Sequence, residues 1–315
     1  MKEFPLAAAS LAGIALPALA GAVSGHTGAG MAAALGGLLL NMTDEAPFKD
    51  ELCGFILSLT AGCTAILTGT LLKNAGVPYL IPLLAFPAAL LGGLSRTMVR
   101  ITTQFILFTI IAAGSEGQGS LLLAPLFLTG GVISFITHMA LRKKQEYPPK
   151  PKYTSAQYIN RWKRTLKTID GWRYTLILTL CLALASAYDA AFPHHHGYWA
   201  ALTAVIVVRR DHGMMRVRIA ERALGTAAGI LLTVTFIWLQ VPWQMPALAL
   251  LAFLRPLWYL SRYTLYAAVM TPLVILLLDF GKAAEWGIIN DRLLATLAGC
   301  ATAYAAAYFT SPKVS

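Results

Sequence analysis

Residues 120–140 read SLLLAPLFLTGGVISFITHMA, a run that contains no Asp, Glu, Lys or Arg. Such a run is long enough to cross a hydrocarbon core of about 30 Å as a helix. Similar runs fill the rest of the 315-residue chain, in which 57% of the residues are hydrophobic and 12% are charged. Soluble domains have about 25% charged residues. The sequence therefore predicts an all-α integral membrane protein, and it excludes a secreted disulfide scaffold, a disordered chain and a cytosolic enzyme.

The apolar segments predict about twelve transmembrane helices. They lie near residues 5–24, 28–42, 52–72, 77–94, 98–113, 120–140, 172–192, 197–208, 217–239, 244–260, 263–280 and 288–309. Segments 28–42 and 197–208 are short for a full span, so the number of spans falls to ten if they are half-buried or tilted helices. The first segment is also similar to a signal peptide, but Lys2 is the only basic residue before it and further spans follow, which favours an uncleaved span.

Lysine and arginine set the orientation of such helices. If both termini face the cytoplasm and all twelve segments cross the cell (inner) membrane, 22 of the 25 Lys and Arg lie inside. Only Lys73, Lys282 and Arg292 then lie outside. The net charge of +11 follows from this positive-inside distribution, so no nucleic-acid partner is predicted.

Residues 141–171 form a basic cytoplasmic linker between a first six-span repeat at 1–140 and a second at 172–310. Within the linker, an apolar face recurs at helical spacing opposite a basic face, which predicts an amphipathic helix on the inner leaflet. The apolar positions are Tyr158, Trp162, Leu166 and Ile169, and the basic positions are Arg161, Lys163, Arg164 and Lys167. A solvated connector whose charges only enforce topology is the alternative.

Six spans in each half give both halves the same orientation, which predicts two parallel six-helix repeats with a pathway between them. A shift of 168 residues pairs Gly25-His26 with Pro193-His194, and a shift of 166 pairs Ser95-Arg96 with Ser261-Arg262. The identity is thin, and chance similarity between two apolar sequences is the alternative.

Two segments of the second half share one spacing, with an arginine, a threonine four residues on and a glycine seven residues on. The first consists of Arg222, Thr226 and Gly229, with Gly225 between them, and the second consists of Arg292, Thr296 and Gly299. Residues at this spacing lie on one face of a helix. The pattern therefore predicts a positive charge beside a groove where a ligand or a neighbouring helix comes close.

Together with Trp199-Ala-Ala-Leu-Thr203 and Thr271-Pro272, this spacing resembles the signature of the fusaric acid resistance and aromatic acid exporter family. The plant aluminium-activated malate channels share that signature. The resemblance covers about residues 172–309, whereas the first half is similar only in layout. It implies export of aromatic or other organic carboxylates. The arginines agree, because an arginine near the bilayer interior is costly and marks a pathway or an anion site, and a guanidinium holds a carboxylate through two hydrogen bonds.

We therefore predict a substrate site formed by Arg222, Thr226, Arg292, Thr296, Trp199 and Tyr198, with Gly225, Gly229 and Gly299 giving room. Structural alternatives stay open for each group. In the alternative for Arg222, its side chain pairs with Glu221 or extends to the inner surface. In the alternative for Arg292, it pairs with the neighbouring Asp291. In the alternative for Trp199 and Tyr198, both belong to an interfacial aromatic belt.

Asp189 and Asp279 lie near the outer ends of apolar spans and are the predicted proton-coupling groups. The tract His194-His195-His196 favours pH sensing over metal binding, because consecutive histidines do not converge on one ion. No metal and no cofactor are predicted.

The sequence thus predicts a transporter, and not an enzyme, that exports organic anions, with aromatic carboxylic acids as the expected substrates. An anion channel of the same fold and a non-transporting partner of a larger efflux assembly are the alternatives. The expected partners are a small organic anion and the lipid bilayer, while a periplasmic adaptor protein and a homodimer stay open.

Overall fold

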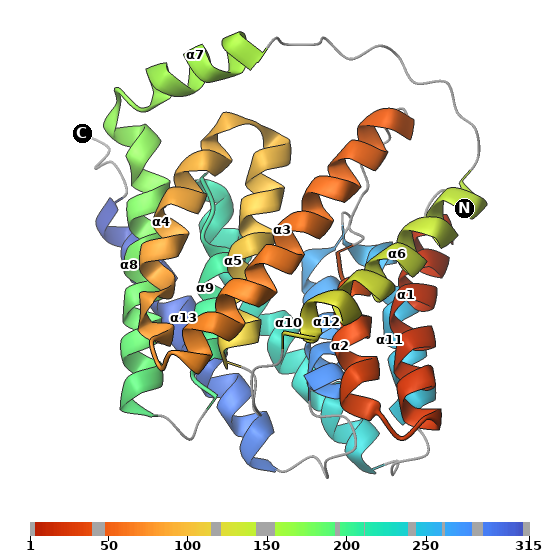
Figure 1. Ribbon diagram of the computed structural model, residues 1–315. Coiled ribbons are helices and arrows are strands. Elements are labelled where there is room, and N and C mark those ends of the chain that lie inside the picture. Colours follow the sequence, from red (N-terminus) through yellow and green to blue (C-terminus); the bar gives the residue numbers. More distant parts are fainter. Residues whose placement is uncertain are drawn as a thin grey trace. The chain divides into compact units, whose positions relative to one another are not determined.

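The computed structural model describes residues 4–39, 48–114, 121–142, 155–192, 196–210, 212–238, 244–259, 262–278 and 286–310. Every regular element within these ranges is a helix (Figure 1). The first half holds α1 (Phe4–Val23), α2 (Thr27–Gly37), α3 (Phe48–Asn74), η1 (Pro78–Leu80), α4 (Ile81–Leu91), η2 (Gly92–Leu94), α5 (Arg96–Gly114) and α6 (Leu123–Leu141). The linker holds α7 (Ser155–Thr165), and the second half holds α8 (Ile169–Ala191), α9 (Tyr198–Val207), α10 (His212–Trp238), α11 (Gln244–Trp258), α12 (Tyr263–Leu278) and α13 (Trp286–Thr310).

Five of the described helices are long and apolar enough to cross a membrane, namely α1, α3, α5, α6 and α8. The prediction of an all-α membrane protein is therefore confirmed. Each of the twelve predicted segments overlaps a helix, but the number of spans stays a prediction because several helices are short. The helices α2 and α9 have 11 and 10 residues, which corresponds to about half the thickness of the hydrocarbon core at about 1.5 Å per residue.

Two tight connections between helices depend on glycine. Gly25 separates α1 from α2 and has a φ of +76°, and Gly76 separates α3 from η1 and has a φ of +69°. Only glycine adopts such angles without steric cost. Pro78 then begins η1, where its missing N–H is not needed. These residues explain why the long apolar sequence is divided at these two points.

The linker contains the predicted helix, α7, which ends at Thr165. Ile169 begins α8 and is 81% exposed, so it does not continue the apolar face of α7. Trp162 is half-buried, and its Nε1 donates a hydrogen bond to the carbonyl oxygen of Leu90, at 3.0 Å, near the end of α4. The side chain of Trp162 on α7 is therefore held by a hydrogen bond to α4.

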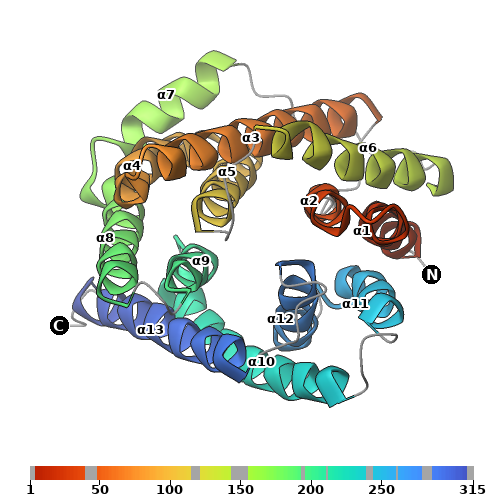
Figure 2. The ribbon, with the colours of Figure 1, turned by 60° about the horizontal axis from the view of Figure 1, so that its bottom comes forward.

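The chain divides into two compact units, and unit 1 comprises residues 1–64, 120–147 and 224–289. Within it, α1 packs against α2, α6 and α11, while α12 contacts α2 and α11. Figure 2 looks along α1 and α2 and shows α6 beside both. The backbones approach closely, since a Cβ on Gly37 would lie 2.6 Å from the carbonyl oxygen of Gly13. The core of unit 1 consists of Ile14, Ala18, Met31, Ala34, Leu248, Leu251, Ala252, Val269, Leu273 and Leu277.

Unit 2 comprises residues 65–119, 148–223 and 290–315. Within it, α8 packs against α4 and α9, and α5 contacts α4 and α9 (Figure 2). Arg210, which follows α9, contacts both α4 and α8. Its NH2 donates a hydrogen bond to the carbonyl oxygen of Ala89 on α4 at 2.9 Å, and its Cζ lies 4.4 Å from the centroid of the Tyr174 ring on α8. The short helix α9 therefore lies between helices that come from different parts of the chain.

Each unit combines helices from both halves of the sequence. Unit 1 contains α1, α2 and α6 with α11 and α12, and unit 2 contains α8 and α9 with α4 and α5. The compact units therefore do not coincide with the sequence segments 1–140 and 172–310, which stay a prediction about the repeat. The contacts also correspond, since α1 packs on α2 and α11 as α8 packs on α9 and α4.

Candidate functional site

Unit 2 contains a pocket of about 460 Å³. Its walls come from both halves of the sequence, with the connection from α3 to α4 and the end of α5 on one side and α8 and α9 on the other. The lining residues include polar and aromatic side chains, namely Tyr79, Ser186, Asp189, His196 and Tyr198. A concave site with a few convergent polar groups is a candidate for ligand binding.

Asp189 positions the start of α9 in the wall of this pocket. It lies in the last turn of α8, and its carboxylate accepts hydrogen bonds from the backbone N–H groups of Gly197 and Tyr198. A carboxylate is stabilised at a helix N-terminus because the unpaired N–H groups carry partial positive charge. Glycine is needed at position 197, since a Cβ there would lie 2.5 Å from Oδ1 of Asp189.

His196 connects the pocket with α13. Its φ is +46°, in the left-handed region that non-glycine residues rarely adopt. Its Nδ1 lies 3.3 Å from Oδ2 of Asp291, whose exposed fraction is 7%. Because sparsely populated backbone conformations cluster at functional sites, His196 is a candidate functional residue.

On another side of α9, Arg292 contacts Trp199. The Cζ of Arg292 lies 3.1 Å from the centroid of the indole ring, and both side chains are buried. A guanidinium over an indole face is attracted by the negative charge of the ring. Gly299 lies against the same helix, since a Cβ there would lie 2.6 Å from the carbonyl oxygen of Ala200. The structure thus brings together Arg292, Trp199 and Gly299, whereas Thr296 is buried with no hydrogen-bond partner for Oγ1 among the described residues.

The other arginine of the repeated spacing, Arg222, lies on α10 and is 3% exposed. Its alternative partner, Glu221, is instead 3.4 Å from Arg218, measured from Oε2 to NH1. Thr226 follows one turn later and is fully buried. Gly225 and Gly229 face α12, since added Cβ atoms would lie 2.6 Å from the Thr264 carbonyl oxygen and 2.7 Å from the Ala268 carbonyl oxygen, respectively. Within the described ranges, neither Arg222 nor Arg292 lines the pocket.

Two parts of the predicted site cannot be compared with the structure. Asp279, the second predicted proton-coupling group, and the histidines at 194 and 195 lie outside the described residues. In the part of the chain that is described, no three His, Cys, Asp or Glu side chains lie close enough together to hold a metal ion.

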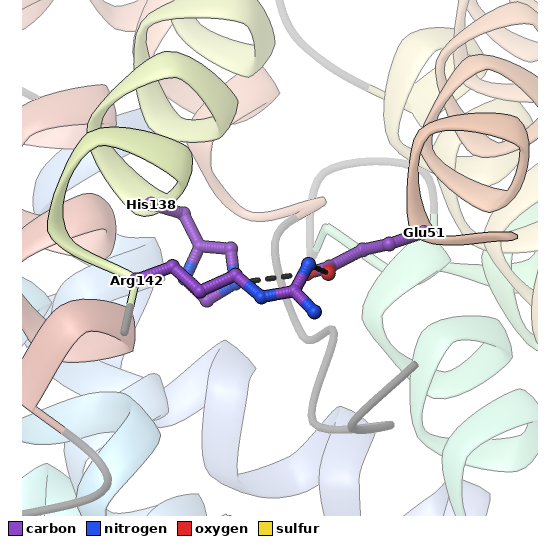
Figure 3. Close-up of polar contacts among 3 residues, drawn as sticks. All are labelled: Glu51, His138 and Arg142. Atoms are coloured by element: carbon purple, nitrogen blue, oxygen red, sulfur yellow. Dashed lines mark hydrogen bonds and ion pairs between the residues drawn. The ribbon is translucent and has the colours of Figure 1, made fainter. Parts of the chain in front are cut away.

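One polar cluster was missed by the sequence reasoning. In unit 1, Glu51, His138 and Arg142 contact one another (Figure 3). A signal for it was present, because His138 is the only ionisable residue of the run 120–140, and an ionisable residue in an apolar span is a functional candidate. Its partner Glu51 lies 87 positions away, a pairing that periodicity does not reveal.

The fold and these buried polar groups define a helical membrane protein with several apolar spans and a polar pocket. Residues 178–306 match the family described as fusaric acid resistance protein-like, which confirms the resemblance inferred from the second half of the sequence. Over 143 residues, or 45% of this chain, the sequence is 32% identical to the inner membrane protein YccS of Escherichia coli (strain K12), and the match covers 20% of that relative. No solved structure matches the chain.

Proposed function

We propose that this chain is a membrane transporter that exports organic anions, with aromatic carboxylates as its main substrates. The observation that carries the proposal is the pocket of unit 2, which lies between helices of both sequence halves. All of the second-half residues in its wall, from Ala185 to Ala201, lie inside the segment that matches the fusaric acid resistance protein-like family. A pathway between two halves is expected in transporters built from repeats.

The side chains of the pocket support an aromatic substrate. Tyr79 and Tyr198 both belong to its lining, and aromatic rings prefer offset or edge-to-face contact with another ring. Arg222 and Arg292 are the proposed groups that bind the substrate carboxylate along the pathway. Both are buried in helices of the matched segment, where a permanent charge is costly unless it has a role.

Asp189 is the proposed proton-coupling group. It lines the pocket, so an ionised Asp189 would repel a substrate carboxylate in the same space. Protonation of Asp189 and occupancy of the pocket by an anion are therefore linked, and the linkage acts equally in both directions. His196 and Asp291 extend the polar groups from the pocket to Arg292 on α13.

The proposal includes twelve spans in two parallel six-helix repeats. The matched helix contacts in the two units support it, and so does one detail at the same joint of each unit. In unit 1, Arg255 of α11 donates to the Leu38 carbonyl oxygen after α2 at 3.3 Å. In unit 2, Arg210, after α9, donates to the Ala89 carbonyl oxygen on α4. In both units an arginine thus joins the second helix of one proposed repeat to the fourth helix of the other. The arginine belongs to the fourth helix in unit 1 and follows the second helix in unit 2.

Cytoplasmic termini are proposed together with this topology. The ends of α5 and α8 and the start of α9, which the charge distribution assigns to the outside, meet at the pocket. The side chains of Trp162 and Arg210 instead contact carbonyl oxygens near the end of α4. The pocket and these basic or linker groups therefore lie toward opposite ends of α4, as alternating spans require.

The function is tested by counterflow in proteoliposomes that contain the purified chain. Labelled benzoate, a labelled aliphatic dicarboxylate and a labelled neutral aromatic amide are compared, each with its unlabelled form inside the vesicles. The expected result is accumulation of benzoate above equilibrium, with less of the dicarboxylate and none of the amide. Flux down the electrical gradient without counterflow would identify a channel, and no carboxylate flux at all would contradict transport of organic anions.

A further inference from the structure

A second group of ionisable side chains lies in unit 1, far in sequence from the proposed transport residues. Glu51 occupies the first turn of α3, and His138 and Arg142 lie at the end of α6 (Figure 3). Oε1 of Glu51 is 2.8 Å from Nε2 of His138, and Oε2 forms an ion pair with NH1 of Arg142. Glu51 and His138 are buried, with exposed fractions of 7% and 8%. One carboxylate therefore serves two potentially cationic groups in a site with little water.

The surroundings of this cluster are apolar. Phe55 of α3 and Phe135 of α6 stack with ring centroids 4.1 Å apart, and Ala9 of α1 packs against them. The described part of α1 has no charged or titratable residue, and α2, which also packs against α6, has none either. On α3 the neighbouring charged groups are Lys49 and Asp50, both exposed, and on α6 the neighbouring charged group is Arg142. Glu51 is thus the one buried anion near His138 in the described parts of these helices.

The hydrogen bonds define the state of the imidazole. Nε2 of His138 faces a carboxylate oxygen, so it carries a hydrogen and donates it. Nδ1 is buried and has no hydrogen-bond partner among the described residues. With a neutral imidazole, the charges of Glu51 and Arg142 cancel. A proton on Nδ1 would add a positive charge and an unpartnered buried donor, and both are unfavourable without rearrangement.

We propose that Nδ1 of His138 is a proton-binding site, and that proton binding there loosens the pair between Glu51 and Arg142. The protonated imidazole competes with the guanidinium for one carboxylate, and the two cations repel each other. Arg142 is the C-terminal cap of α6 and has an extended backbone with a ψ of 129°. Loss of this ion pair removes one of the contacts that hold Arg142 at the end of α6, where the linker between the two halves begins. Proton binding at His138 in this way loosens the end of α6.

The inference is tested by the mobility of a spin label at position 141, whose leucine is 43% exposed. Leu141→Cys is labelled after the four cysteines of the chain have been replaced, and spectra are recorded between about pH 5 and pH 8, where imidazoles titrate. The mobile component should grow as the pH falls. It should not change with pH in His138→Gln, which keeps an amide donor for Glu51 but binds no proton.

Two further variants complete the test. Asp50→Asn changes an exposed carboxylate next to Glu51 and should behave as the parent does, whereas Glu51→Gln should be mobile at every pH. A parent spectrum that is independent of pH, or an unchanged pH response in His138→Gln, would overturn the proposal. Because His138→Gln preserves the hydrogen bond to Glu51, a failure of Glu51→Gln to fold does not affect this comparison.

A second measurement follows the proton itself. In the protein labelled with ¹⁵N-histidine, the Nδ1 resonance of His138 is assigned by its disappearance in His138→Gln. It should move from the position of an unprotonated nitrogen to that of a protonated one over the same pH range in which the spin label becomes mobile. Movement of the label without protonation of Nδ1 would contradict the proposed site. Neither measurement involves a transported substrate, so their outcome is independent of the proposed transport function.

Discussion

Nδ1 of His196 lies 3.3 Å from Oδ2 of Asp291, a contact that joins the wall of the pocket to the first part of α13. The next residue along α13 is Arg292, whose guanidinium lies over Trp199 of α9. Two consecutive residues of α13 therefore contact His196, two residues before α9, and Trp199, the second residue of α9. This arrangement connects the wall of the pocket to Arg292, one of the two proposed carboxylate-binding arginines.

Arg222→Ala is expected to weaken carboxylate binding. A charge-assisted contact with two hydrogen bonds contributes about 1.5–3 kcal/mol, or roughly 10- to 150-fold in affinity. Arg222→Lys should recover only part of this, because an ammonium keeps the charge without the planar pair of donors. The measurement is the concentration dependence of counterflow. Arg218→Gln, on the same helix and paired with Glu221, is the control and should keep the parent affinity. Unchanged affinity in a folded Arg222→Gln variant would assign a structural role to Arg222.

Asp189→Asn should separate uphill export from exchange. The amide oxygen can still accept hydrogen bonds from Gly197 and Tyr198, so α9 stays in place, but the side chain no longer binds and releases a proton. We expect counterflow to continue and proton-driven accumulation to stop. Ser186→Ala, another change in the pocket lining, should keep both activities. Normal uphill export by Asp189→Asn would exclude this residue as the coupling group.

Gly36→Ala should destabilise the folded protein. A Cβ at Gly36 of α2 would collide with the backbone oxygen of Phe127 on α6, and a collision with backbone is not relieved by rotating a side chain. Overpacking of this kind costs about 1–3 kcal/mol. Gly28→Ala on the same helix is the matched control, because nothing lies within 4 Å of its added Cβ. Thermal unfolding in detergent should show a clear loss of Tm for position 36 only. Equal Tm values would mean that α2 and α6 are not packed this closely.

The cytoplasmic position of the linker is tested by cysteine labelling. In a chain without its native cysteines, an impermeant maleimide added outside intact cells should label Gly119→Cys and should not label Ser155→Cys. The expectation follows from the 22 Lys and Arg of 25 that the proposed topology places inside. Labelling of position 155, or no labelling of position 119, would contradict the proposed orientation.

The sequence predicted the helical segments well because each is an apolar run bounded by charged or turn-forming residues. It also identified α2 and α9 as short, since their runs are too brief for a full span. It placed Trp199 and Arg292 in one candidate site from their motifs, but it did not reveal that the two side chains stack, because that contact joins α9 to α13.

Other features depend on tertiary structure and left no periodic signal. Tyr79 and Ser186 enter the pocket because the connection from α3 to α4 packs near α8, and neither residue is unusual in its own segment. The pairing of Glu51 with His138 likewise requires α3 and α6 to meet. The division into compact units crosses the sequence halves, which hydropathy order alone does not predict.

The most direct test of the transport proposal is substrate protection of a cysteine in the pocket. Ser186→Cys in a chain without native cysteines is treated with a small maleimide in the presence and absence of benzoate, and Ser24→Cys, in the exposed turn after α1, serves as the control. Benzoate should slow the modification of position 186 and leave that of position 24 unchanged. Equal rates at position 186 with and without benzoate, in a protein that still exchanges benzoate, would place the transport pathway elsewhere.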